Sequence, residues 1–383
     1  MNLNDYYTPC VMVDYDKLLK NIQDYQSRAD QAGKELWPMI KTHKCSLIAK
    51  LQKMNGAAGF LAGTLRECEV LLEQKLGPVM FAYPTSGALN VAKALQIGRK
   101  GRLIYSLDGE ANSRQLSEGW LARQEADRAL EDFNALDKDK KELEVMMIIN
   151  SGLHRFGIQP ELAGSLGRFI SSLPGLKLIG ISTHPGQVYG ASGPSEIAGI
   201  AAAEERALRI AYEGLKRKGI EIRYVAAGST PTFSEELNSD LINVVRPGNY
   251  VFHDQIQMNL MGKEEEDCAL TVLATVIARP SLDRLMIDAG SKVFALDQGA
   301  HAIALMDDYG KILGHPELKL VGLSEEVGKI AVDKGVTTVK VGDKLRIIPN
   351  HACPVSNLVD ELNLVRGEKM VGTMPVNMKH ISY

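Results

Sequence analysis

The stretch Leu143-Glu144-Val145-Met146-Met147-Ile148-Ile149-Asn150 is an almost unbroken apolar run that ends in a polar residue. Strands buried on both faces, as in a parallel sheet, show continuous runs of this kind instead of alternation. Seven further runs match it, at Leu36–Lys41, Gly59–Gly63, Val79–Tyr83, Arg102–Leu107, Leu176–His184, Arg223–Ser229 and Asn243–Val251. Helical patterns separate most of them, at Ser46–Met54, Thr64–Glu73, Ala88–Ile97, Pro160–Ser172 and Ile197–Lys218. The alternation predicts a (β/α)8 TIM barrel over residues 11–255.

The pattern of expected strands and helices changes after the predicted barrel. Strand-like runs follow one another without regular helical patterns between them, at Leu270–Arg279, Leu285–Asp288, Leu318–Leu323 and Lys344–Ile348. They predict a mainly β domain over residues 256–383, and residues 1–10 are assigned to it because Tyr7–Val13 is also strand-like. Within the barrel, the charged segment Arg123–Lys141 lengthens the connection Glu110–Glu142, and we expect an extra surface helix there.

Composition narrows the class of protein. The 383 residues exceed the size of a typical single core, so we expect two domains. Apolar residues make up 45% of the chain, and the net charge is -3 without a long basic run, which argues against a nucleic-acid partner. No stretch has the pattern of a secretion signal or a membrane span. Five scattered cysteines indicate reduced thiols, so we expect a cytoplasmic protein.

Lys41 stands where the short run Trp37–Ile40 gives way to Lys41-Thr42-His43-Lys44. A lysine at the end of a buried strand is well placed to offer its amine to a carbonyl cofactor such as pyridoxal 5'-phosphate (PLP). The amine must be neutral to attack, and an apolar wall together with a second cation, Lys44 or His43, would lower its pKa. The alternative is a basic loop after a strand, and the string alone does not separate the two.

The loop Gly228-Ser229-Thr230-Pro231-Thr232 follows the seventh predicted strand. Its small residues allow close approach of the backbone, and its hydroxyl groups can donate hydrogen bonds. A helix is expected to begin at Phe233 with its N-terminal amides towards the loop, and Gly248-Asn249 lie beside it at the eighth strand. A simple helix cap is the alternative, but at this position in a barrel we favour a phosphate site.

Arg155 and His184 follow the fifth and sixth predicted strands, at the end of the barrel where the chemistry of such folds takes place. Arg155 is either a solvated loop cation or a hydrogen-bond donor to a cofactor ring. His184 is either a core histidine or an imidazole that faces a pyridine ring or assists proton transfer. The residues alone leave both choices open.

A further pair lies in the β domain, in Pro349-Asn350-His351-Ala352-Cys353-Pro354. Residues two apart in an extended segment point to the same side, so the His351 imidazole and the Cys353 sulfur could share one ion. This donor pair suits zinc, and two protein ligands leave positions open for water or substrate. For a motif this short, a chance histidine and cysteine in a turn is the alternative.

Together these motifs resemble those of the PLP-dependent D-threonine aldolase and D-serine dehydratase family, whose architecture is similar to that of alanine racemase. The resemblance covers nearly the whole chain. It rests on Lys-Thr-His-Lys at 41–44, Gly152-x-x-Arg155-x-Gly157, His184-x-Gly186-x-x-Tyr189, Gly228–Thr232, Arg246-Pro247-Gly248-x-Tyr250, Asp288–Lys292, Ser324–Glu326 and Pro349-Asn350-His351-x-Cys353.

The resemblance implies a role for each residue. The catalytic residues would be Lys41 and His184, with Lys41 as the general base. The residues that hold PLP would be Lys41, Arg155, His184, Tyr189, Ser229, Thr230, Gly248 and Asn249. His351 and Cys353 would bind a divalent metal against the 3-hydroxyl group of the substrate, with zinc favoured and manganese or magnesium as alternatives. The family resemblance also implies a homodimer and a small D-amino acid as substrate.

The reaction implied is β-elimination of water from a 3-hydroxy-D-amino acid, because a His-x-Cys metal pair looks like the dehydratase branch. The products would be a 2-oxo acid and ammonia. Retro-aldol cleavage of the D-threonine aldolase type, to glycine and an aldehyde, is the alternative; a racemase and a non-catalytic PLP-binding protein are further ones. D-serine, D-threonine and 3-hydroxy-D-aspartate all remain open as substrates. One departure stands out: Val327 follows Ser324-Glu325-Glu326, where the family often has a histidine.

Overall fold

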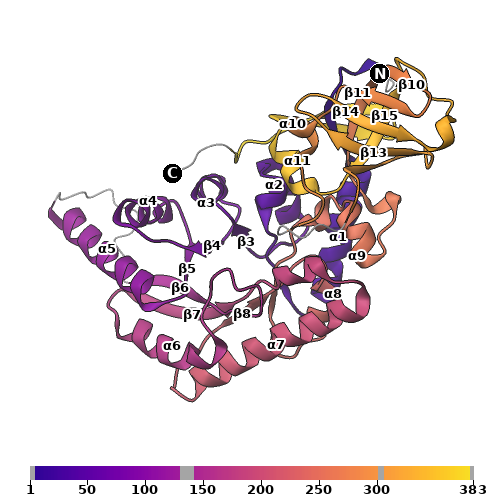
Figure 1. Cartoon of the computed structure of the whole chain (residues 1–383). Helices are drawn as coiled ribbons and strands as arrows, with labels where there is room; N and C mark the ends of the chain where they lie inside the picture. The colour runs from indigo at the N-terminus through magenta and orange to yellow at the C-terminus, as the bar shows by residue number, and fades with distance from the viewer. Residues whose placement is uncertain (1–4, 130–141, 301–305, 380–383) are drawn as a thin grey trace.

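The computed structural model describes residues 5–129, 142–300 and 306–379. Figure 1 shows a barrel of strands and helices built from the earlier part of the chain and a β domain, built largely from the later part, that stands to one side of it. None of the helices in these ranges is long and apolar enough to cross a membrane.

Parallel strands form the barrel, namely β2 (Glu35–Leu36), β3 (Phe60–Ala62), β4 (Val79–Pro84), β5 (Leu103–Leu107), β6 (Leu143–Ile148), β7 (Leu176–Ser182), β8 (Tyr224–Ala227) and β9 (Val244–Val245). Their order in the sheet is β2-β9-β8-β7-β6-β5-β4-β3, so neighbours in sequence are neighbours in space. A parallel bridge between Met39 and Leu61, with a hydrogen bond from the Leu61 N–H to the Pro38 carbonyl (2.9 Å), joins the two ends of this order. The predicted eight-stranded barrel is therefore confirmed.

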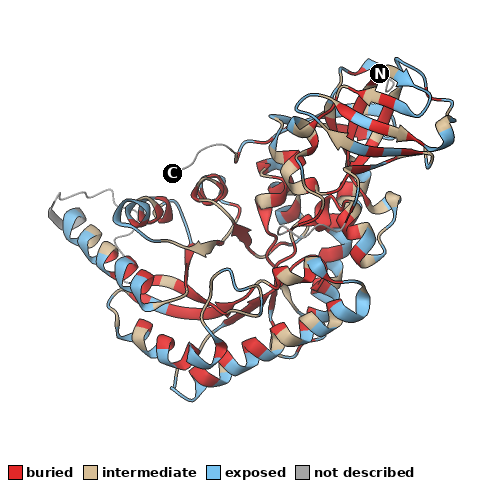
Figure 2. Cartoon of the chain, in the orientation of Figure 1, coloured by how far each residue is buried: buried red, intermediate tan, exposed pale blue. Residues whose placement is uncertain are grey.

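Helices cover the outside of the barrel, namely α1 (Tyr15–Gln31), α2 (Ser46–Met54), α3 (Leu65–Glu73), α4 (Ala88–Gly98), α5 (Glu110–Ala129), α6 (Ala163–Ser172), α7 (Pro194–Lys216) and α8 (Phe233–Glu236). Their starts follow from local chemistry: the Asp14 carboxylate caps α1, and the Thr64 hydroxyl accepts from the Glu67 N–H (3.2 Å) to cap α3. Figure 2 shows the barrel strands mostly buried and the helices exposed on their outer sides.

The first and last barrel strands are much shorter than the sequence predicted, and a proline follows each of them closely. β2 ends at Leu36, and the chain passes Pro38 into the 3-10 helix η2 (Ile40–Thr42). β9 ends at Val245, and the chain passes Pro247 into η5 (Asn249–Val251). Proline has no N–H to continue a sheet ladder, so the regular strand pairing is interrupted at both points. Beyond Pro38, the Met39–Leu61 bridge is made before η2 begins. Lys41 therefore lies on a helical turn and not at the tip of a strand.

The predicted extra helix is part of α5, which starts the long connection between β5 and β6. The rest of the segment predicted to be helical, residues 130–141, lies outside the described residues.

The inside of the barrel is filled by one apolar layer that is distinct from the core between the strands and the helices. Its members are Trp37, Met39, Leu61, Met80, Ile104, Met146, Ile179, Tyr224, Ala226 and Val244. They come from every strand of the barrel or from the residues next to it, as the inward-facing positions of such barrels do. The barrel is a packed core, so a ligand has room only above this layer.

The β domain is a sheet of β1 (Cys10–Asp14), β10 (Leu270–Ser281), β11 (Arg284–Ile287), β12 (Gly310–Ile312), β13 (Leu318–Leu323), β14 (Gly328–Val332), β15 (Lys344–Pro349), β16 (Glu361–Arg366) and β17 (Lys369–Pro375). The opening strand β1 pairs antiparallel with β10 and parallel with β16. The sequence missed β12, β14, β16 and β17, which are short or have polar residues at alternate positions. Short helices α9 (Gln255–Met261), α10 (Ser291–Phe294) and α11 (Ala352–Asn357) complete this part.

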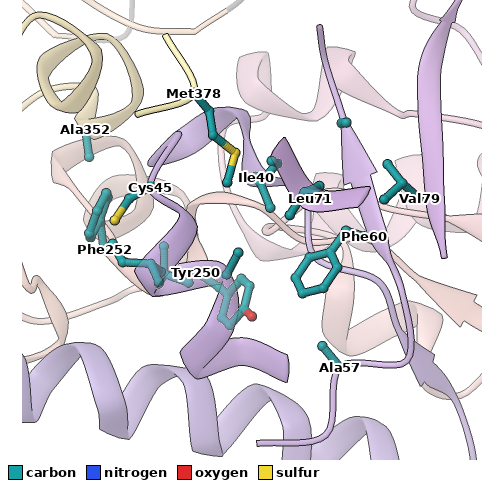
Figure 3. Packing of buried hydrophobic residues seen from close by; sticks show 14 of the residues in the cluster. Ile40, Cys45, Ala57, Phe60, Leu71, Val79, Tyr250, Phe252, Ala352 and Met378 are labelled. Carbon is teal, nitrogen blue, oxygen red and sulfur yellow. The ribbon is translucent and has the colours of Figure 1, made fainter. Parts of the chain in front are cut away.

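The two parts of the molecule share a continuous core around η2 and α2. Figure 3 shows Ala352 and Met378 of the later chain in one cluster with Ile40, Cys45 and Phe252. Close by, the Asn377 side chain accepts from the Ser46 N–H (3.0 Å) and donates to the Ser46 hydroxyl (2.9 Å) at the first turn of α2. The segment that carries Lys41 is therefore packed between barrel and β domain.

Three charged side chains are buried behind the loop that follows β8: Glu204 of α7, Glu236 of α8 and Arg246 after β9 are 0%, 2% and 5% exposed. Glu204 accepts from the Gly228 N–H (3.3 Å), and a Cβ atom on Gly228 would lie 2.6 Å from Glu236 Oε2. Burial raises the pKa of Glu236 to about 7 and that of Glu204 well above its usual value, while it lowers the pKa of Arg246 to about 10.

Truncation of the barrel layer tests the packing. Ile104 on β5 is completely buried, so Ile104→Ala should lower the free energy of unfolding by about 2–5 kcal/mol in chemical denaturation. Leu89→Ala on α4, where the side chain is 87% exposed, is the control and should change it by less than about 0.5 kcal/mol. Equal losses in the two variants would contradict a packed barrel interior.

The buried acids give a pH dependence of known sign. The pKa of Glu236 in the folded state, about 7, exceeds its unfolded value of roughly 4.3, so between these values the folded state binds more protons. Stability should therefore fall as the pH rises from about 5 to about 8, and Glu236→Gln should remove roughly 1–3 kcal/mol of that fall. The measurement is urea unfolding across this range, with the exposed neighbour in Glu235→Gln as the control. Parallel curves for wild type and Glu236→Gln would contradict the prediction.

Candidate active site

A cavity of about 530 Å³ lies at the carboxyl ends of the barrel strands, against the β domain. Met39 and Leu61 of the barrel layer form part of its lining. All the site residues predicted from the sequence also line it, namely Lys41, Arg155, His184, Tyr189, Ser229, Thr230, Gly248, Asn249, His351 and Cys353. The fold thus brings together residues from both ends of the chain at the place where barrels of this kind carry out chemistry.

The turn that carries Lys41 is held by the β domain. The Lys41 carbonyl accepts from the Asn357 side chain (3.1 Å), and the Thr42 carbonyl accepts from the Ser356 hydroxyl. Farther along, the Lys44 carbonyl accepts from the Met378 N–H (3.0 Å). These three bonds use carbonyl groups that a short 3-10 turn cannot satisfy internally, so the turn has one defined position in the cavity wall.

The second cation beside Lys41 is Lys44. Its ammonium lies 3.2 Å from Glu67 Oε1, and the other oxygen of this fully buried carboxylate accepts from the Gly63 N–H (2.6 Å). Burial raises the pKa of Glu67, and the neighbouring Lys44 opposes that rise. His43, the other suggestion from the sequence, does not have this role, because it is completely buried and burial lowers its pKa to about 3. The sequence did not single out Glu67, although the spacing Thr64-x-x-Glu67 is a recognisable helix-start pattern.

The 228–232 loop forms an open, polar corner of the cavity. The Thr232 hydroxyl accepts from the Ser229 N–H (3.2 Å), and the Thr230 hydroxyl accepts from the Gly248 N–H (3.3 Å). Gly228 has φ +128°, and a Cβ atom on Gly248 would lie 3.1 Å from the Thr42 hydroxyl, so bare backbone is required at both places. Small residues, hydroxyl groups and backbone amides at this corner fit a phosphate group.

The structure corrects two predictions about this corner, one on the helix at Phe233 and one on Asn249. The predicted helix at Phe233 is only one turn long, and its Glu235 and Glu236 amides donate to the Thr232 carbonyl (3.0 and 3.1 Å). A helix dipole therefore adds little to anion binding here. The Asn249 side chain turns away to Asp254 (2.5 Å), so Asn249 can offer the phosphate corner only its backbone.

Arg155, His184 and Tyr189 form a second part of the wall. The Arg155 guanidinium is exposed and lies over the rings of Phe156 and Tyr83, 4.5 and 5.4 Å from their centroids. His184 Nδ1 lies 3.2 Å from the Gly228 carbonyl, which ties the imidazole to the phosphate corner. Tyr189 is partly buried, and burial raises the pKa of its phenol. An aromatic or planar cofactor would meet a cation and an imidazole on this wall.

His351 and Cys353 lie where β15 gives way to α11. His351 has extended backbone and Cys353 lies in the first turn of α11, so the predicted extended segment ends between them. The Cys353 thiol donates to the Thr42 hydroxyl (3.3 Å), and His351 Nδ1 lies 2.7 Å from Asp297 Oδ2. Burial works against a charged His351, but Cys353 and Asp297 outweigh it and raise its pKa to about 10.

The donor set tests whether a metal fits. A thiol and an imidazole on one cavity wall suit zinc, and the Asp297 contact at Nδ1 leaves Nε2 of His351 for an ion. Within residues 5–129, 142–300 and 306–379, no group of three or more His, Cys, Asp or Glu side chains is placed to hold a metal ion.

Asp254 is a further site residue that the sequence analysis missed. This completely buried carboxylate accepts from the Asn249 side chain (2.5 Å), the Ala352 N–H (2.8 Å) and the Gln257 N–H (3.1 Å). It therefore connects the phosphate corner to the segment between His351 and Cys353. Its position just before α9 marks it as a helix cap in sequence, but nothing in the sequence points to Ala352 as its partner.

Val327 lies in the turn between β13 and β14, where its carbonyl accepts from the Ser324 N–H (2.9 Å). The carbonyls of Ser324 and Glu325 accept from the amides of Ser291 and Lys292 (2.8 and 3.1 Å), so two of the motifs identified in the sequence form one unit. None of these residues lines the cavity of the described chain.

Comparison with known proteins agrees with this architecture. Residues 13–255 match the family model of the alanine racemase N-terminal domain, and residues 269–365 match a putative serine dehydratase domain. D-threo-3-hydroxyaspartate dehydratase of Delftia sp. strain HT23 is 30% identical over 90% of both chains. D-serine dehydratase of Dictyostelium discoideum is 27% identical over 97% of this chain and 96% of the relative.

A solved structure gives the same result. D-threonine aldolase from Filomicrobium marinum superimposes with a TM-score of 0.86 at 25% sequence identity, covering 98% of this chain and 97% of the other. The two domain models match consecutive parts of this chain, and the relatives match it over nearly their whole length. The chain therefore belongs to the family that joins an alanine racemase N-terminal domain to a serine dehydratase domain.

Proposed function

We propose that this PLP-dependent lyase removes water from a 3-hydroxy-D-amino acid, giving a 2-oxo acid and ammonia. One contact carries the proposal, because it joins the His351–Cys353 pair to the turn that holds Lys41. The Cys353 thiol donates to Thr42, the residue next to Lys41. This contact supports a general base and a Lewis-acid site beside one substrate volume. Dehydratases of D-serine and D-threo-3-hydroxyaspartate are among the full-length relatives and support this choice.

The residues of the cavity fit PLP. Lys41 would carry it, the backbone and hydroxyl groups of Ser229, Thr230, Gly248 and Asn249 would hold its phosphate, and Arg155, His184 and Tyr189 would line its ring. When bound, PLP withdraws electrons from the α-carbon of an amino acid and so makes its proton acidic.

Individual side chains of the protein have separate roles in the proposed reaction. The Lys41 amine, once released by the substrate, is the general base for the α-proton, because its turn is fixed by Asn357 and Ser356 at the cavity wall. Lys44 pairs with Glu67, which holds its side chain in one place near that amine. His184, held at Nδ1 by the Gly228 carbonyl, would line the ring of the cofactor.

We further propose that His351 and Cys353 hold a divalent cation, with zinc favoured over manganese or magnesium. Such an ion would polarise the 3-hydroxyl group of the substrate, which is otherwise a poor leaving group. One solved structure of the related 3-hydroxyaspartate dehydratase is described as a cysteine-to-alanine mutant in a metal-free form, which supports a metal in that relative.

Retro-aldol cleavage is the second candidate reaction, since D-threonine aldolase has the same fold over nearly the whole chain. It would need a base for the 3-hydroxyl proton where elimination needs an acid or a metal. We also propose a cytoplasmic homodimer; the five cysteines are free thiols, which fits a reducing compartment.

Product analysis separates the two reactions. The purified protein with PLP and zinc should release ammonia and a 2-oxo acid from D-serine, D-threonine or 3-hydroxy-D-aspartate, and nothing from the L-isomers. Lys41→Ala should lower kcat by roughly 10²–10⁴-fold because the base is lost. Lys50→Ala, on the exposed side of α2, is the matched control and should leave kcat unchanged. Glycine and an aldehyde as products would assign the protein to the aldolase reaction instead.

Removal of the metal is the second test. Dialysis against a chelator should abolish the elimination and leave the absorbance of bound PLP in place, because the two groups have separate ligands. Added zinc should restore activity to the wild type but not to His351→Ala. Full activity after dialysis, with no zinc detected by elemental analysis, would show that the reaction proceeds without a metal.

A further inference from the structure

The Asp297 carboxylate makes the closest side-chain contact of His351. Asp297 Oδ2 lies 2.7 Å from His351 Nδ1, and the two side chains are 40% and 20% exposed. His351 also interacts with Cys353.

The main chain of Asp297 is bound to the same segment. The side chain of Asn350, which is 2% exposed, donates to the carbonyls of Asp297 (3.1 Å) and Asp308 (2.6 Å). Because Asn350 directly precedes His351, the carboxylate and the imidazole are presented to each other by one hydrogen-bonded unit. This makes the pair a built feature and not a chance meeting of two surface side chains.

The backbone on the other side of His351 is fixed as well. The Ala352 N–H donates to the buried Asp254 carboxylate (2.8 Å), so the residues before and after His351 both have defined partners. The remaining freedom of His351 is the rotation of its side chain. The Asp297 contact is the one that sets this rotation.

We infer that Asp297 is a positioning residue for metal binding: it holds His351 Nδ1 so that Nε2 faces the ion that His351 and Cys353 share. The inference rests on the metal site of the proposed function. A carboxylate on the far nitrogen fixes the tautomer of a metal-binding histidine and increases its basicity, and loss of such a partner typically weakens metal binding by about 10–100-fold. No local sequence pattern points to this residue, because Asp297 lies 54 positions before His351.

The test measures zinc alone, on the PLP-loaded protein, by competition with a chromophoric chelator. Asp297→Ala should bind zinc about 10–100-fold more weakly than wild type. Asp297→Asn, which keeps an oxygen acceptor without the charge, should lie between the two. Asp307→Asn is the matched control, since Asp307 is 85% exposed and pairs only with Lys319 (2.7 Å) among the ion pairs of the described residues.

A second readout distinguishes positioning from damage to the fold. With cobalt in place of zinc, the visible spectrum should change in Asp297→Ala but not in Asp307→Asn, while PLP absorbance and the unfolding midpoint stay as in wild type. Zinc affinity within threefold of wild type in Asp297→Ala would overturn the inference and leave the metal site standing. A wild-type protein that binds no zinc would overturn both the metal site and this inference, and the product assay would still report on the lyase reaction.

Discussion

The site depends on one constraint: hydrogen bonds from the β domain hold the turn after β2 in place. The carbonyls of Lys41, Thr42 and Lys44 all accept hydrogen bonds from residues near the C-terminus, namely Asn357, Ser356 and Met378. Buried carbonyls must find donors, and a 3-10 turn next to a proline has few of its own. The barrel alone would leave this turn undetermined, so the lysine acquires its position only when the second domain is in place.

The corner of the cavity formed by the 228–232 loop likewise depends on contacts between different elements of the fold. Behind the 228–232 loop, Glu204 and Glu236 share a buried site with Arg246, and the loop needs glycine at 228 because a carboxylate oxygen occupies the space of a Cβ atom. Arg246 in turn donates to the Thr183 carbonyl at the end of β7. Buried charges of this kind add little net stability, but removal of one partner leaves another unpaired. These buried groups restrict the loop to one conformation, and they also make the stability of the fold depend on pH.

Periodicity was enough to predict the barrel, since eight apolar runs separated by helical patterns leave few other folds. It could not show that prolines 38 and 247 end the first and last strands early, because an apolar run continues past both. All ten predicted site residues line one cavity, since barrels gather chemistry at one end of their strands. The roles of Asp254, Asp297 and Asn357 could not be predicted from the sequence. Each of them acts through a partner far away in sequence, and no local pattern indicates such a contact.

Asp254 shows how the two halves of the cavity become one site. Its carboxylate holds the Asn249 side chain next to the phosphate corner and the Ala352 amide between His351 and Cys353. Burial raises the pKa of Asp254, while His351 and the three hydrogen bonds stabilise its charged form. A movement of the His351 segment would therefore change the hydrogen bond to Asn249 at once, because both bonds end on the same oxygen. The Asn249 side chain and the His351 segment are thus joined through a single buried carboxylate.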